Sequence, residues 1–206
     1  NHCINDIAVC GASRASILTG VRGSKSRFVK YYTRADEDLP NAVTLAKLFK
    51  RNGYTTGSIG KIYHEWKDNQ DEWDIYRNFR EQRDYQSKKT LRMIEKRKEI
   101  NPNQPNNYIG PAWEYADVED DAYTDGKLTD FAIKTLSDFK DSQDPFFLAV
   151  GYVSPHLPFI QPKKYGEMYD DSDLTISREK TIPKNAHNRS YHNWEELRNG
   201  YLDIPK

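Results

Sequence analysis

Apolar residues recur at helical spacing in two parts of the chain. The longer pattern predicts an amphipathic helix over residues 124–140. Its apolar members are Leu128, Phe131, Ala132, Ile133, Leu136 and Phe139. The shorter pattern predicts a helix over residues 44–52, which follows a helix-start signal at residues 38–41 and is capped by Gly53. Its apolar members are Val43, Leu45, Leu48 and Phe49.

Two other stretches have the pattern of strands. Residues 54–60 are short and rich in threonine, and they follow the helix ended by Gly53. Residues 146–152 form a continuous apolar run between turn signals, which predicts a fully buried strand of a parallel or mixed sheet. A helix followed by a Gly-Tyr turn and a strand is typical of an α/β crossover, so we expect an α/β fold.

Small residues surround a cysteine near the start of the chain. The pattern predicts a helix over residues 13–18, which Thr19 and Gly20 bring to an end. Cys10 then lies at the positive end of the helix dipole, where anions are stabilised, and Arg14 faces the same way one turn later. This arrangement predicts a nucleophile beside an anion site. The alternative is a buried free cysteine next to a helix start.

Three polar side chains follow the two predicted strands. Lys61 and His64 come directly after the first strand, and His156 follows the second between two prolines that restrict its backbone. Because ligands gather at the carboxyl ends of strands in open α/β folds, we expect Lys61 and His64 to meet an anion together with Arg14. The alternative is a surface lysine and a histidine whose hydrogen bonds are satisfied within the fold.

Composition and charge narrow the classes of partner. The 206 residues suffice for one domain, and 31 basic side chains balance 31 acidic ones. This balance indicates neither a nucleic-acid partner nor a membrane surface, and no apolar run is long enough to span a membrane. The basic segment 21–27 is either a solvated loop or a contact for an acidic substrate. A disulfide between Cys3 and Cys10 would remove the nucleophile, so we expect none.

Other segments carry weaker signals. The acidic run 115–123 lacks the glycine-centred loop of an EF-hand and is predicted to lie at the surface rather than to bind Ca²⁺. Residues 79–99 are strongly charged, which is typical of an exposed helix or an irregular insertion. Metal binding by His187 and His192 near the end of the chain is the less favoured reading of that polar stretch.

Residues 10–14, Cys-Gly-Ala-Ser-Arg, followed by Leu-Thr-Gly at 18–20, resemble the signature of the type I sulfatases, whose cysteine is oxidised to formylglycine. Further segments are similar to the iduronate-2-sulfatase-like group of that family, and the likeness runs with gaps from residue 9 to residue 174. These segments are Gly-Lys-Ile-Tyr-His at 60–64, Pro-Phe-Phe-Leu-Ala-Val-Gly-Tyr at 145–152, Pro-His-Leu-Pro-Phe at 155–159 and Pro-Lys-Lys-Tyr at 162–165.

The resemblance implies an alkaline-phosphatase-like sulfatase fold, with a mostly parallel central sheet flanked by helices. It implies that Cys10, as formylglycine, is the nucleophile and a ligand of Ca²⁺, with Mg²⁺ as the other possible metal. Arg14 would orient the hydrated aldehyde, and Lys61 would bridge the aldehyde and the sulfate. His64 and His156 would contact the sulfate or the diol, and one of them would carry a proton. The family's carboxylate metal ligands do not occur in this chain.

The implied function is therefore removal of sulfate from a sulfated sugar, a 2-O-sulfated uronic acid of a glycosaminoglycan or an algal polysaccharide. The implied partners are a formylglycine-generating or anaerobic sulfatase-maturing enzyme and the rest of a parent chain. We expect residues 1–206 to be part of a catalytic domain that lacks its first strand and its last metal-ligand segment. The resemblance places the protein in the periplasm, the lysosome or outside the cell, although no signal peptide is visible.

Two alternatives stay open. The first is a phosphonate or phosphate monoester hydrolase of the same superfamily. The second is a non-catalytic module that keeps the anion pocket without turnover.

Overall fold

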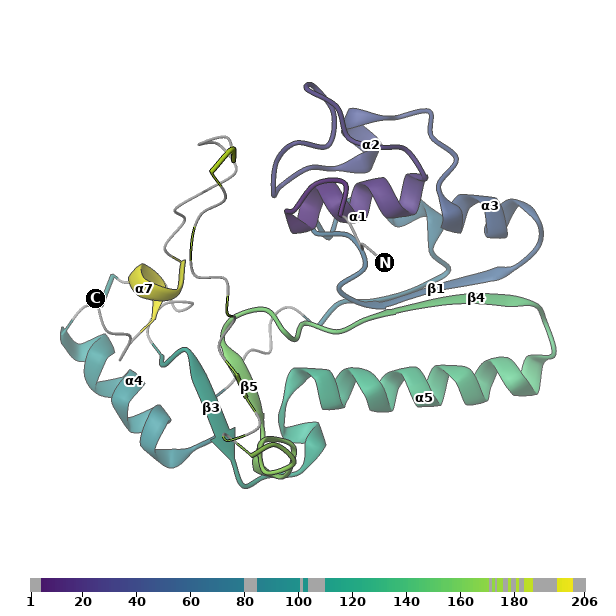
Figure 1. Cartoon of the computed structure of the whole chain (residues 1–206). Helices are drawn as coiled ribbons and strands as arrows, with labels where there is room; N and C mark the ends of the chain where they lie inside the picture. The colour runs from purple at the N-terminus through teal and green to yellow at the C-terminus, as the bar shows by residue number, and fades with distance from the viewer. Residues whose placement is uncertain are drawn as a thin grey trace. The chain divides into compact units, whose positions relative to one another are not determined.

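The structure is a computed structural model. It describes residues 5–79, 85–100, 102–103, 110–170, 172, 174–175, 178, 181, 184–186 and 196–201. These residues form two compact units, one from residues 1–82 and 124–153 and the other from residues 83–123 and 154–206. The positions of the two units relative to one another are not determined (Figure 1).

The first unit contains a three-stranded parallel sheet in the order β2-β1-β4. Its strands are β1 (Thr55–Gly60), β2 (Ile75–Arg77) and β4 (Phe146–Gly151). Its helices are α1 (Cys10–Thr19), α2 (Ala35–Asp38), α3 (Leu45–Arg51), the short 3₁₀ helix η1 (Gln70–Glu72) and α5 (Thr124–Ser142). Figure 1 shows α1 and α3 on one face of the β1–β4 pair and α5 on the other, which confirms the α/β architecture.

The predicted helices of this unit form with small shifts at their ends. The helix predicted at 124–140 is α5, which extends two residues further. The helix predicted at 44–52 is α3; the side chain of Thr44 caps it by accepting from the backbone N–H of Lys47. The prediction that this helix starts at residues 38–41 is wrong. Asp38 is the last residue of α2, and α3 begins only at Leu45, where Thr44 provides the cap.

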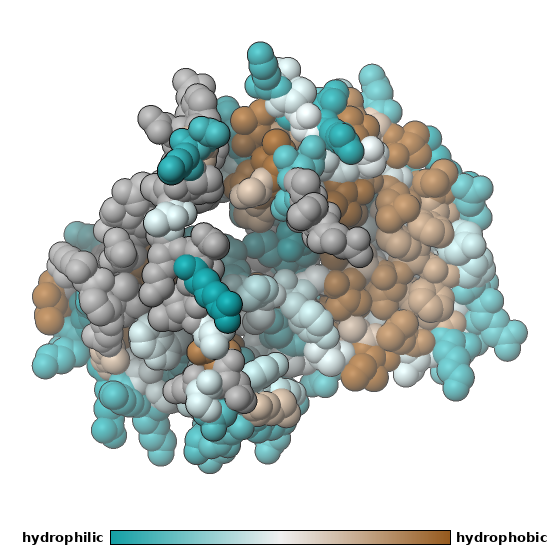
Figure 2. Space-filling view, in the orientation of Figure 1, coloured by the Kyte–Doolittle hydropathy of each residue, from teal (hydrophilic) through white to brown (hydrophobic). Residues whose placement is uncertain are grey.

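Strand β4 is less buried than the apolar run predicts. Phe147 stacks on Phe49 of α3, and Phe146 stacks on Phe139 of α5, so the strand does use both faces. Yet Phe146 and Val150 keep 40% and 39% of their surface exposed. Among the described strands β4 pairs only with β1, so it forms an edge of the sheet and the prediction of full burial is wrong. On the face of this unit that is turned toward the viewer, hydrophobic residues gather into a patch (Figure 2).

Small residues let α1 pack closely into the core. Ala12 and Ala15 are almost fully buried, and they cluster with Phe28, Tyr63 and Trp73. A second cluster of Ile59, Leu128 and Ala132 joins β1 to α5. The carboxyl end of β1 is thereby held between helices, and the loop that follows it runs beside α1.

The second unit holds a parallel pair of strands, β3 (Trp113–Ala116) and β5 (Phe159–Pro162), with Trp113 opposite Phe159. Its helices are α4 (Lys88–Ile100), the 3₁₀ helix η3 (Asp120–Ala122), α6 (Lys163–Gly166) and α7 (Glu196–Gly200). Helix α4 confirms the exposed helix predicted within residues 79–99. The acidic run 115–123 begins with the last two residues of β3. Its acidic residues Asp117, Glu119 and Asp121 are exposed, as predicted.

None of the described helices is both long and apolar enough to cross a membrane. The tail histidines His187 and His192 lie outside the described residues.

Candidate active site

Cys10 is the first residue of α1. The helix begins three residues earlier than predicted, with Val9 in extended conformation as its cap, and it ends at Gly20 in the left-handed conformation (φ 69°). Cys10 is partly exposed and its thiol is free, whereas Cys3 lies outside the described residues. Cys10 therefore lies at the end of the helix where the backbone N–H groups and the positive end of the dipole stabilise an anion.

An open cleft of about 730 Å³ lies beside Cys10. Its lining comes from the segment before α1, from α1 itself, from the loop after β1, and from the end of β4 and the residue that follows it. The lining residues are Asn5, Ala8, Val9, Cys10, Ser13, Arg14, Ile17, Leu18, Lys61, Ile62, Ala149, Val150, Gly151 and Tyr152. The charged side chains among them are Arg14 and Lys61, so the cleft favours an anion.

His64 lies directly against Cys10. The Cys10 Sγ is 3.1 Å from His64 Nδ1, and the other ring nitrogen, Nε2, is 3.5 Å from Glu65 Oε1. This order of groups allows the imidazole to accept a proton from residue 10, while the carboxylate stabilises the resulting positive charge. Glu65 was not expected from the sequence, where it is one acidic residue among several in an uninterpreted segment.

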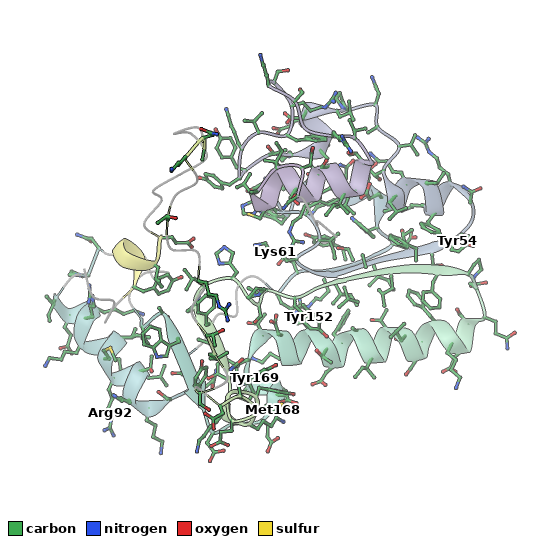
Figure 3. The ribbon with its side chains drawn as sticks, viewed as in Figure 1. Tyr54, Lys61, Arg92, Tyr152, Met168 and Tyr169 are labelled. Atoms are coloured by element: carbon green, nitrogen blue, oxygen red, sulfur yellow. The ribbon has the colours of Figure 1, made fainter. Side chains whose placement is uncertain are left out.

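Arg14 ties α1 to the loop after β1. Its Nη1 donates to the backbone carbonyls of Lys61 and Ile62, the second at 2.9 Å. The backbone N–H of Lys61 donates in turn to the carbonyl of Gly151 at the end of β4 (2.7 Å). Figure 3 shows Lys61 below α1, where the strands end. Arg14 thus holds the loop that carries Lys61 and His64, and its predicted role toward an aldehyde stays a prediction.

The structure brings together four of the five residues that the sequence singled out: Cys10, Arg14, Lys61 and His64 lie around one end of α1. His156 belongs to the second unit, where its Nδ1 lies 2.9 Å from the carbonyl oxygen of Leu157. Because the two units are not placed relative to one another, the predicted contact of His156 with the sulfate stays a prediction.

The cleft does not fit a metal ion on the residues described. No acidic side chain is among the residues that line it, and the two cations there would repel a divalent metal. Throughout the described part of the chain, no group of three or more His, Cys, Asp or Glu side chains is placed to hold a metal. We therefore assign no step of the chemistry to a metal held by this chain.

A buried glutamate side chain is hydrogen-bonded to the loop after β1. Glu72, in η1, is almost fully buried and accepts hydrogen bonds from the hydroxyls of Thr44 and Tyr63, the residue before His64. Burial raises the pKa of Glu72 from its ordinary value of 4.5 to about 7, although the hydrogen bonds from Thr44 and Tyr63 and the charge of Lys47 oppose this shift. Glu72 therefore links the start of α3 to the loop after β1. The sequence contained no signal for it.

This carboxylate makes stability depend on pH. The folded protein keeps the Glu72 proton up to about pH 7, whereas the unfolded chain loses it near 4.5. The free energy of unfolding should therefore decrease as the pH rises between these two values. Glu72→Gln, which has the same size and no proton to lose, should flatten this decrease in denaturant titrations of the full-length protein from pH 4.5 to pH 8. Glu95→Gln, at an exposed position of α4, is the control and should keep the wild-type slope. An unchanged slope in Glu72→Gln would contradict the assignment.

Comparison with known proteins agrees with these features. The Sulfatase family model matches residues 6–203. The chain is 30% identical over 197 residues to iduronate 2-sulfatase of Homo sapiens. The aligned region covers 93% of this chain and 34% of that protein. It is 29% identical over 187 residues to an arylsulfatase of Clostridium perfringens, covering 80% of this chain and 37% of that protein. It is 24% identical over 193 residues to a sulfatase of Formosa agariphila, covering 82% of this chain and 33% of that protein.

The chain spans about a third of the length of these curated relatives. The family model, by contrast, covers nearly all of the chain, including α1, β1, β4 and every residue around the cleft except Asn5. With its parallel sheet between helices, the fold is consistent with the alkaline-phosphatase-like architecture of that family. The chain belongs to the sulfatase family.

Proposed function

We propose that the protein containing this chain hydrolyses sulfate esters of a sulfated sugar, with residue 10, oxidised from cysteine to formylglycine, as the nucleophile. One observation carries the proposal. Cys10 occupies the first position of α1, 3.1 Å from His64, in a cleft whose charged lining residues are Arg14 and Lys61. Membership of the sulfatase family supports the same conclusion.

The charges of the cleft suit this chemistry. The oxygens of a sulfate ester repel an approaching nucleophile, so a site must neutralise them before the nucleophile can reach the sulfur. The Lys61 ammonium and the N–H groups at the start of α1 provide positive charge at the cleft. Arg14 contributes by fixing the loop that carries Lys61 through its two carbonyl contacts.

His64 is placed to move a proton. A nucleophilic hydroxyl on residue 10 must lose a proton as its oxygen bonds to sulfur. The bond from sulfur to the sugar oxygen breaks in the same step, and that oxygen takes up a proton from an acid in the site or from water to leave as a hydroxyl. His64 Nδ1 faces residue 10 and can accept the proton of the nucleophilic hydroxyl, and Glu65 at Nε2 favours the protonated ring. Formylglycine, as a hydrated aldehyde, supplies the hydroxyl together with a second one that allows sulfate to leave.

The relatives and the charge of the cleft support a substrate class. Relatives named iduronate 2-sulfatase are 30% identical over most of the chain. We therefore propose a sulfated uronic acid, 2-O-sulfated, within a glycosaminoglycan or an algal polysaccharide. A sulfatase-maturing enzyme would have to act on Cys10, and a metal of the Ca²⁺ type would need ligands from outside this chain. Such a protein would work in the periplasm, in the lysosome or outside the cell.

Sulfate release tests the proposal. The full-length protein is produced together with a sulfatase-maturing enzyme and incubated with defined sulfated disaccharides and with the matching phosphate monoesters. We expect free sulfate, measured by ion chromatography, from a 2-O-sulfated uronic acid and little phosphate. Equal hydrolysis of both esters would favour a phosphate or phosphonate hydrolase. Binding of the disaccharides without release of either anion would indicate a non-catalytic module.

A further inference from the structure

Residues 30–32 run directly past the start of α1. The backbone carbonyl of Tyr31 lies so close to Gly11 that a Cβ at that position would overlap it, and the carbonyl oxygen of Lys30 would be in tight contact with that Cβ. Gly11 is the neighbour of Cys10. The path of the chain therefore brings Tyr31 next to the proposed nucleophile, although 21 positions in the sequence separate it from Cys10.

A row of aromatic rings extends from His64 to solvent. The ring of Tyr31 meets the ring of His64 edge-on, with centroids 5.9 Å apart, and it meets the ring of Tyr32 edge-on at 5.0 Å. Tyr31 and Tyr32 nevertheless keep 51% and 49% of their surface exposed. Two neighbouring tyrosines that are half open to water beside a reactive site present apolar ring surface that a ligand can cover.

Positive charge accompanies these rings. The Lys30 ammonium lies over the ring of Tyr32, 5.2 Å from its centroid, and interaction with the Tyr32 hydroxyl raises the pKa of Lys30. Lys30 is thus a cation at every relevant pH. The segment leading to it, residues 22–29, contains Arg22, Lys25 and Arg27. One carboxylate lies near this segment, that of Asp38, which accepts from the backbone N–H of Phe28 and also raises the pKa of Lys30. The surface beside the aromatic row is therefore suited to an anionic ligand.

A sulfated oligosaccharide combines the two properties that this surface matches. The C–H faces of sugar rings pack against aromatic rings, and the sulfates or carboxylates of the chain pair with lysine. Resting on the function proposed above, we propose that Lys30, Tyr31 and Tyr32 form a subsite that binds the sugar units next to the one that loses its sulfate. The protein would then prefer a chain of sugars to an isolated sulfate ester.

Comparing a long substrate with a short one tests this subsite. The ratio of kcat/KM for a multiply sulfated tetrasaccharide to kcat/KM for a small aryl sulfate is measured on the full-length protein. The double variant Tyr31→Ala, Tyr32→Ala should lower this ratio about tenfold, mainly through KM, because the contacts of two rings are lost; tenfold corresponds to about 1.4 kcal/mol. Phenylalanine at both positions should restore most of the ratio. Tyr169→Ala, an exposed tyrosine in the second unit, is the matched control and should leave it unchanged.

A binding measurement separates failure of the subsite from failure of the proposed function. In the inactive Cys10→Ala background, calorimetry gives the affinity for the tetrasaccharide without turnover. Lys30→Gln should weaken binding of the sulfated tetrasaccharide several-fold but not that of its desulfated analogue, whereas Lys134→Gln, on α5, should change neither. Wild-type protein that binds the tetrasaccharide but releases no sulfate would contradict the proposed function alone. The subsite proposal would be overturned if the Tyr31, Tyr32 double variant left the kcat/KM ratio unchanged and Lys30→Gln left the affinity for the sulfated tetrasaccharide unchanged.

Discussion

Cys10→Ala should lower sulfate release by about 10⁴-fold or more, because removal of an essential nucleophile leaves only binding and electrostatic stabilisation. The side chain is small and partly exposed at the start of α1, where alanine is compatible with the helix. The fold and the affinity for sulfated saccharide should therefore survive the change. Steady-state sulfate release, circular dichroism and calorimetric binding measure the three quantities.

The other cysteine of the chain is the control for this variant. Cys3→Ala should retain activity, since we expect no disulfide between the two cysteines and assign no chemistry to Cys3. Activity of Cys10→Ala within tenfold of the wild type would exclude residue 10 as the nucleophile. A parallel loss of activity and of the circular dichroism signal would instead assign Cys10 a structural role.

Lys61→Gln should lower kcat by about 10²–10³-fold, the usual cost of removing one group that stabilises developing negative charge. Only 9% of the surface of Lys61 is exposed, and this residue lines the cleft together with Cys10. Glutamine keeps much of its length and loses the charge, and the backbone N–H that donates to Gly151 is not altered. The effect should therefore appear in kcat rather than in the free energy of unfolding.

Lys67→Gln provides the matched control, because this lysine lies over the ring of Trp66 and not among the residues of the cleft. It should leave kcat unchanged. A Lys61→Gln protein with wild-type kcat would show that its charge does not act on the sulfate. A change in the denaturation midpoint as large as the change in kcat would indicate that Lys61 serves the fold.

Local patterns placed the residues that the sequence singled out. Small residues predict a helix start beside Cys10 and Arg14, and a short strand precedes Lys61 and His64. Their choice over the structural alternatives rested on the resemblance to the sulfatase signature. The parallel pairing of β1 with β4 likewise agrees with the patterns of the two runs. These features depend on local order along the chain, and local order is what a sequence pattern records.

Features that depend on contacts between distant segments were not found. Tyr31 matters through its position beside the ring of His64, and that position depends on how residues 30 and 31 pass Gly11. Glu65 directly follows His64 in the sequence, but its contact with Nε2 depends on side-chain conformations that a sequence pattern does not record. Strand β2 has three residues, too few for any periodicity. The full burial predicted for β4 was wrong because burial depends on the neighbours of a strand in the sheet, which the apolar run does not specify.

The chemical state of residue 10 tests the central claim most directly. The full-length protein, made in a host that contains a sulfatase-maturing enzyme, is digested, and the peptide that contains Cys10 is analysed by mass spectrometry after treatment with a hydrazine reagent. The account predicts that the peptide has lost its sulfur and carries an aldehyde, trapped as the hydrazone. An intact cysteine thiol at position 10, in protein that still releases sulfate, would contradict it.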